Sequence, residues 1–248
     1  MNPVLLWFHR TGSPPNFDRY AARWAPWAFA LAFVGFAIGI YGALFSVPAD
    51  YQQGENFRIL YIHVPSAWMS LFIFGVMAIQ SFIALVWRIK ICEILAMACA
   101  PIGAAFTLIT LITGSIWGKP TWGTWWTWDP RLTMTVILWT VFAVYLILRT
   151  VGRDDPQIAR YAAVLALIGV LDIPVLHVSV RLWRGVHPSV ISAPASKGGL
   201  EDPRMVTGLL VAMAAFALLF VWLLWLRYEG LRLRDELHRL EDQLEETS

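Results

Sequence analysis

Long apolar stretches, almost free of charged side chains, divide the chain into six segments. Five contain no Asp, Glu, Lys or Arg, and the sixth contains only Asp172; the six cover residues 24–49, 59–87, 94–118, 132–148, 161–180 and 205–226. An α-helix needs about 17 to 25 residues to cross roughly 30 Å of hydrocarbon. The pattern therefore predicts an all-α, polytopic membrane protein with six transmembrane helices.

Composition and charge narrow the class further. The 248 residues are 58% hydrophobic and 15% charged, whereas soluble domains are about 45 to 50% apolar and about 25% charged. The net charge of +2 leaves no basic stripe for a nucleic acid. Cys92 and Cys99 lie seven residues apart on one predicted helix, about 10 Å along its axis, which is too far for a disulfide. Both are expected to be core residues.

The distribution of Lys and Arg predicts the orientation of the chain. Six spans place both termini on one side, and with the termini inside, twelve basic residues lie inside and seven outside. Positive residues favour the cytoplasmic side. We therefore expect a cytoplasmic segment 1–23, a membrane domain 24–227 and a cytoplasmic amphipathic tail 228–248. The outer face then carries a Trp-rich interfacial segment, 117–131, and a histidine-bearing loop, 181–204.

The tail carries a regular apolar stripe. Its leucines follow a 4-3-4 spacing, which places them on one face of a helix: Leu233, Leu237, Leu240 and Leu244. The remainder of that helix is charged. Two interpretations stay open, a solvated extension of the last span or a docking surface for a cytoplasmic partner.

The segment between the third and fourth spans is the most distinctive part of the chain. Five of the fourteen tryptophans fall within twelve residues: Trp117, Trp122, Trp125, Trp126 and Trp128. Indoles prefer the membrane interface, so the segment is expected to lie along the surface. An ordinary aromatic belt is one interpretation. The other is an apolar wall of side-by-side indoles on which a large planar ligand, such as a porphyrin, can stack.

Charged residues near this segment fit a ligand with carboxylates. Arg131, Lys119 and Arg58 could neutralise such groups, since charge-assisted bonds from Arg to a carboxylate are strong. Asp129 is expected to pair with Arg131 or to cap the fourth membrane helix rather than to perform chemistry.

Three of the five histidines fall toward the same face. His63 lies near the start of the second span and His187 in the loop after the fifth, so the two imidazoles could be the axial ligands of a haem iron. A single interfacial histidine can equally be a structural hydrogen bonder. His177 is the substitute ligand or a supporting residue, and His9 and His238 lie in the tails.

Asp172 is the one acid predicted inside a span, where a carboxylate costs about 2.5 to 3.5 kcal/mol on insertion scales. It could hydrogen-bond within the bundle near Pro174 or belong to a polar path. The sequence leaves both open.

The motif Trp122-Gly-x-x-Trp126-x-Trp128-Asp129 resembles the tryptophan-rich signature of the haem-handling proteins of cytochrome c biogenesis. The surroundings of His63 (Tyr-Ile-His-Val-Pro), Pro174-x-x-His177, and Trp183 with His187 are similar to the CcmC branch of that family. The resemblance covers about residues 19–227. Pro188 departs from the pattern, because the family often has Gln there.

The resemblance implies a protein of the bacterial inner membrane that binds haem b at the periplasmic face and passes it to the haem chaperone CcmE. It further implies partners CcmA, CcmB and CcmD, axial ligands His63 and His187, and a platform of Trp122, Trp126, Trp128 and Asp129.

We therefore expect a haem-binding and transfer protein, not an enzyme. No G-x-x-x-x-G-K-[ST] loop is present, so any ATP hydrolysis would come from a partner. Two alternatives remain, a cytochrome b-type electron-transfer subunit and a transporter that carries haem across the membrane.

Overall fold

The computed structural model describes residues 6, 14–152, 155–183, 187, 200 and 202–247. His9, Pro188 and most of the predicted loop 181–204 lie outside them. The regular structure of the described part is helical: α2 (Pro14–Tyr41), η1 (Gly42–Ser46), η2 (Glu55–Ile59), α3 (Leu60–Trp87), α4 (Lys90–Trp122), α5 (Pro130–Val151), α6 (Pro156–Gly169), α7 (Asp172–Trp183) and α8 (Pro203–Thr247). Six helical stretches are long and apolar enough to cross a membrane. The all-α, six-span prediction is confirmed.

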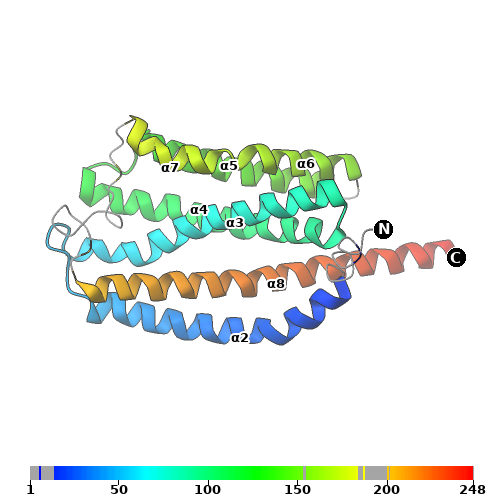
Figure 1. Ribbon diagram of the computed structural model, residues 1–248, viewed down its shortest axis with the longest axis horizontal. Helices are drawn as coiled ribbons and strands as arrows, with labels where there is room; N and C mark the ends of the chain where they lie inside the picture. Colours follow the sequence, from blue (N-terminus) through cyan, green and yellow to red (C-terminus); the bar gives the residue numbers. More distant parts are fainter. Residues whose placement is uncertain are drawn as a thin grey trace.

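The helices run roughly parallel to one long axis. Helix α2 lies along α8, α3 packs along α4 in the middle, and α5 with α6 and α7 lies on the other side (Figure 1). The beginning of α2 and the end of α8 lie at the same end of the bundle (Figure 1), as an even number of spans requires. Large apolar side chains remain exposed along the helices, including Phe33 at 67% and Ile147 at 61%, which suits a surface that faces lipid.

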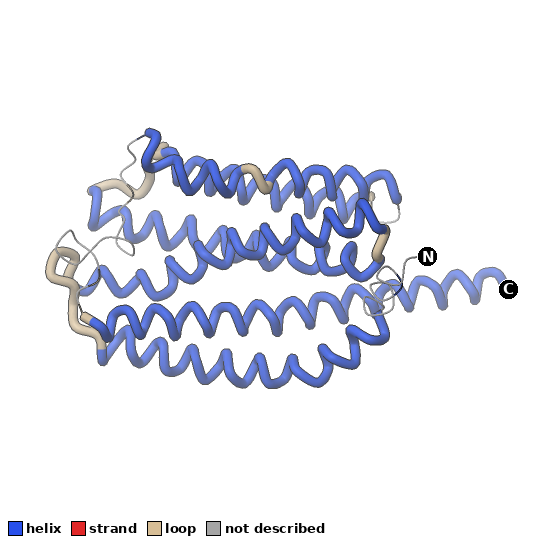
Figure 2. Tube along the Cα trace, in the orientation of Figure 1, coloured by secondary structure: helices blue, strands red, loops and turns tan. Residues whose placement is uncertain are grey.

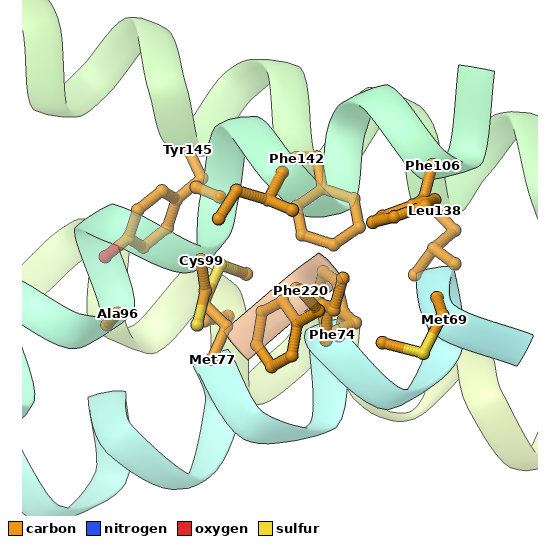
Figure 3. Packing of buried hydrophobic residues seen from close by; sticks show 14 of the residues in the cluster. Met69, Phe74, Met77, Ala96, Cys99, Phe106, Leu138, Phe142, Tyr145 and Phe220 are labelled. Carbon is orange, nitrogen blue, oxygen red and sulfur yellow. The ribbon is translucent and has the colours of Figure 1, made fainter. Parts of the chain in front are cut away.

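Aromatic and sulfur side chains fill the centre of the bundle. Phe74 of α3 and Phe142 of α5 are fully buried, with ring centroids 4.9 Å apart in an edge-to-face arrangement (Figure 3). Cys99 lies in the same cluster and Cys92 in a second one, both as free thiols. The prediction that both cysteines are core residues is confirmed.

The fifth span is broken, a feature that the sequence prediction of one continuous segment did not include. Helix α6 ends at Gly169 and α7 begins at Asp172, halfway along the bundle (Figure 2). Pro174 has no N–H to donate to the Val170 carbonyl, and that carbonyl instead accepts from Ile173 at 3.2 Å. The Oδ2 atom of Asp172 is buried and finds no hydrogen-bond partner in the described structure, so the expected bond within the bundle is not seen for this oxygen.

Two helices are longer than their charge-free stretches. Helix α4 continues past Gly118 to Trp122 and ends at Gly123, whose φ of 78° is the left-handed conformation that favours glycine. Helix α8 continues through the predicted tail, and its last turns extend beyond the other helices (Figure 1). The four tail leucines are exposed on this extension. The tail is thus a helical extension of the last span, and its apolar stripe is exposed on the surface.

Gly103 of α4 gives a direct test of the central packing. A Cβ at this position would overlap the ring of Phe142, which is fully buried and cannot move aside. We expect Gly103→Ala to lower the free energy of unfolding by about 1 to 3 kcal/mol. Gly75→Ala is the control, because a Cβ there meets nothing within 4 Å and should stabilise α3 by about 0.5 to 1 kcal/mol. Thermal unfolding in detergent, followed by circular dichroism, measures both; equal stability of the two variants would contradict this packing.

Candidate functional site

His63 lies at the start of α3, where the short helix η2 leads into the span. Its side chain is only 8% exposed, and its Nδ1 atom lies 3.0 Å from the hydroxyl of Thr113 on α4. The Thr113 hydroxyl also lies 2.6 Å from the carbonyl of Ile109, one turn back on its own helix. The imidazole is therefore held from two helices.

Trp117 forms a wall beside this imidazole. It lies one turn beyond Thr113, with its ring centroid 5.6 Å from that of His63 and the two planes at 76°. Its indole N–H donates to Oε1 of Gln53 at 2.6 Å, which fixes the ring. Gly114 lies on the same turn, where a Cβ would come within 3.1 Å of Cε1 of His63. The absence of a side chain at Gly114 lets the imidazole approach α4.

His187 reaches the same region from the segment after α7. Arg131, at the start of α5, lies at the same end of the bundle as His63 at the start of α3 (Figure 1). A guanidinium nitrogen of Arg131 lies 3.1 Å from Nδ1 of His187. The Nε atom of Arg131 is buried and has no hydrogen-bond partner among the described residues. The site thus brings together His63, His187 and a partly satisfied arginine.

Asp129 positions Arg131 by capping α5. Its carboxylate accepts from the backbone N–H of Arg131 at 2.9 Å, and Pro130 occupies the first helical position. Both features are typical of a helix N-terminus. The predicted capping role of Asp129 is confirmed.

The indoles around Asp129 differ from the flat wall that was expected. Trp126 and Trp128 are perpendicular, with centroids 5.5 Å apart and planes at 84°. Edge-to-face pairing is favoured by the quadrupoles of the rings, so these two cannot present a common plane. Trp125 and Trp128 are 58% and 74% exposed, and Trp122 is half-buried at the end of α4. The exposed indoles remain available to a ligand or a membrane.

Three further predicted residues make local contacts. Arg58 pairs with Glu55 at 2.5 Å and also donates to the carbonyls of Ala43 and Val47. Lys119 donates to the Gly123 carbonyl at 3.0 Å. The exposed His177 contacts the Ile173 carbonyl through Nδ1 at 3.0 Å. The contacts of these residues hold the backbone of the surrounding loop and helix ends, and only Arg131 of the predicted cations contacts a predicted iron ligand.

Sequence reasoning missed the partners of His63. Thr113 and Gln53 were not singled out, and Trp117 was counted only as part of the Trp-rich run. The sequence does place Thr113, Gly114 and Trp117 within about one turn of α4. It contains no signal for the register between α3 and α4, which decides that His63 faces them.

Comparison with known proteins identifies the family. The family model described as heme exporter protein C (CcmC) matches residues 7–243. Heme exporter protein C of Bradyrhizobium diazoefficiens is 45% identical over 85% of this chain and 80% of its own length. The proteins of that name from Haemophilus influenzae and Escherichia coli are 38% and 39% identical, over 94% and 93% of both chains. The chain therefore belongs to the heme exporter protein C family, a family of multi-pass membrane proteins of cytochrome c biogenesis.

Proposed function

We propose that this protein binds haem b at the periplasmic face of the inner membrane, with His63 and His187 as axial ligands, and passes it to the haem chaperone CcmE. The observation that carries the proposal is that His63, held by Thr113, and the contacting pair Arg131 and His187 lie at the same end of the bundle. No group of three or more His, Cys, Asp or Glu that could hold a bare metal ion occurs in the described part of the chain. Two imidazoles without further ligands suit an iron whose other four positions are filled by a porphyrin.

Thr113 prepares His63 for this role. The Thr113 hydroxyl gives its hydrogen to the Ile109 carbonyl at 2.6 Å, so its lone pair accepts the Nδ1–H of His63 at 3.0 Å. A neutral imidazole with its hydrogen on Nδ1 carries a lone pair on Nε2. The ring is then fixed in the tautomer and orientation that an iron ligand requires.

Arg131 favours the opposite tautomer of His187, with the hydrogen on Nε2. A guanidinium can only donate, so Nδ1 of His187 accepts and the hydrogen of the neutral ring is on Nε2. Ligation through Nε2 requires Arg131 to leave Nδ1. A carboxylate of the porphyrin competes for Arg131 well, because a charge-assisted bidentate bond is stronger than a bond to a neutral ring. His63 would thus be ready to hold the iron as it stands, whereas His187 could do so only after Arg131 had turned to the carboxylate.

The surrounding residues would complete the site. The exposed faces of Trp125 and Trp128 cover the porphyrin edge, while Trp122 and Trp126 support them. Lys119 donates to a backbone carbonyl near the site. Arg58 donates to two backbone carbonyls, which favours a structural role for Arg58 over direct pairing with the ligand. His177, exposed on α7, is the alternative candidate for the second ligand, and its contact with the Ile173 carbonyl favours a supporting role instead.

Partners supply the steps for which this chain has no motif. CcmE accepts the haem, and CcmA and CcmB supply ATP hydrolysis, with CcmD as a small membrane subunit. The excess of Lys and Arg on the side of the termini supports a periplasmic position for the histidines. The exposed indoles at that end offer a surface for the chaperone.

Replacement of either axial histidine tests the site. We expect His63→Ala and His187→Ala each to abolish the bis-histidine absorption bands of purified protein supplied with haem, because one axial position loses its protein ligand. His177→Ala should keep the bands, and CcmE should withdraw haem from this control as from the wild type. Unchanged bands in both axial variants would refute the assignment.

The same preparation separates the two alternatives. Rapid reduction by quinol would favour an electron-transfer subunit, whereas haem transfer without net electron flow favours the proposal. The break between α6 and α7 beside Asp172 is the one feature that favours a transporter, since broken helices line midplane sites. Haem delivery into sealed vesicles that depends on Asp172 would support that alternative.

Thr113 gives a second prediction, directed at the hydrogen bond to Nδ1. Thr113→Val keeps the shape of the side chain but removes the acceptor, so haem affinity should fall by about 10- to 100-fold, the usual effect of losing such a partner. The midpoint potential should shift as well, and Thr113→Ser should restore both. Thr121→Val is the control, because its hydroxyl bonds only to the Trp117 carbonyl one turn back. Haem titration and redox potentiometry measure the two effects. A Thr113→Val variant with the haem affinity and midpoint potential of the wild type would contradict this role of Thr113.

A further inference from the structure

A pocket lies at the end of the bundle opposite His63. Its volume is about 700 Å³. The end of α3, the start of α4, the last turns of α5, the start of α6 and the extension of α8 line it. Neither the histidines nor the tryptophans of the candidate site take part, so this pocket requires an explanation of its own.

Arg149 is the buried charge of this pocket. It belongs to the last turn of α5 and is 7% exposed. One guanidinium nitrogen donates to Glu93 at 2.8 Å and contacts the sulfur of Met97 at 2.6 Å. The other two nitrogens, Nε and Nη1, are buried without a hydrogen-bond partner in the described structure. Unpaired donors on a buried cation are costly, and a turn of the Arg149 side chain toward the pocket that it lines would bring them to an anion there.

With Arg149 included, the pocket is lined by five arginine and lysine side chains and four carboxylates. The other four cations are all exposed: Arg88, Lys90, Arg160 and Arg239. Glu93 is paired with Arg149 and Lys90, Asp155 caps α6 by accepting from the backbone of Gln157, and Asp235 has an interaction of its own. Asp242 is exposed on the extension of α8.

The backbone adds to this positive field. Helix α4 begins at Lys90 without a side-chain cap, and the N-terminus of a helix attracts anions through its dipole and its unpaired N–H groups. The positive end of α4 therefore points toward the region where Arg149 has its unused donors.

Apolar side chains form the remaining wall of the pocket. They come from several helices and include Leu85, Ile94, Ala159 and Leu231. A free phosphate ion would gain nothing from such a wall, whereas the glycerol and acyl portion of a lipid would pack against it. The pocket also lies at the ends of membrane spans, where headgroups are found. Basic pockets between helices at this level are known to bind anionic lipid headgroups.

We propose that this pocket binds the phosphate of an anionic phospholipid, with Nε and Nη1 of Arg149 as donors and the exposed cations around it as the rim. The lipid would fix the ends of α3, α4 and α5 and the extension of α8 relative to one another. The proposal does not depend on the haem site, which lies at the other end of the bundle.

Native mass spectrometry of the full-length protein tests the proposal. Delipidated protein in detergent is given phosphatidylglycerol or phosphatidylcholine, and the retained lipid is counted. The wild type should retain phosphatidylglycerol in preference. Arg149→Gln should reduce its affinity by at least about fivefold, the effect expected for one cation near an anionic headgroup. Arg234→Gln is the matched control, an exposed arginine on α8 outside the pocket.

A second variant guards against misfolding of Arg149→Gln. The double change Arg88→Gln with Arg239→Gln alters only exposed rim residues, and it should weaken phosphatidylglycerol binding by about fivefold for each cation removed. Equal retention of both lipids, or no loss in either variant, would overturn the proposal. Displacement of the lipid by millimolar inorganic phosphate would overturn it too, because the pocket would then bind the free ion. Haem binding that depends on Arg149, in a protein that carries both His63→Ala and His187→Ala, would also overturn it, because the pocket would then bind haem.

Discussion

The packing of α3 against α4 is the contact on which the site depends. These two helices lie together along the middle of the bundle, and their register places His63 opposite Thr113, Gly114 and Trp117. A shift by one residue would turn the imidazole away from the hydroxyl and toward a different face of α4. The buried centre, where Phe74 and Met77 of α3 lie in one cluster with Cys99 and Phe106 of α4, stabilises this register. Packing far from the site therefore determines the orientation of its first histidine.

The apolar surroundings determine where polar chemistry can occur. Within hydrocarbon an unpaired polar group has no water to turn to, so helices satisfy their own backbone and polar side chains gather at helix ends. Accordingly, Thr107, Thr110 and Thr113 bond to carbonyls of their own helix. The hydroxyl of Thr113 also lies 3.0 Å from Nδ1 of His63. The same hydroxyl thus serves the helix and orients His63.

Much of the fold could be predicted from the sequence, because spans of membrane length without charges have few alternatives. The cap at Asp129 was also predictable, since Asp before Pro is a local signal. The break at Asp172 was not predicted, although Pro174 provides its cause. The perpendicular rings of Trp126 and Trp128 and the bond between Arg131 and His187 depend on how the loop after α4 meets the segment after α7. Such contacts between distant segments leave no periodic pattern in the sequence.

The two ends of the bundle share one physical feature. Each contains an arginine with buried donors that the described protein does not satisfy: the half-buried Arg131 with its Nε, and the buried Arg149 with Nε and Nη1. A guanidinium stays charged and holds its donors in a rigid fork. In a low-dielectric site it therefore attracts an anion with several oxygens strongly. Arg131 contacts His187 and follows the segment of exposed indoles, and under the proposed function these neighbours would add affinity for an iron porphyrin. Beside Arg149 lie aliphatic side chains and further cations, which add affinity for a lipid. If both proposals hold, the same charged group would bind different ligands at the two ends, because its neighbours differ.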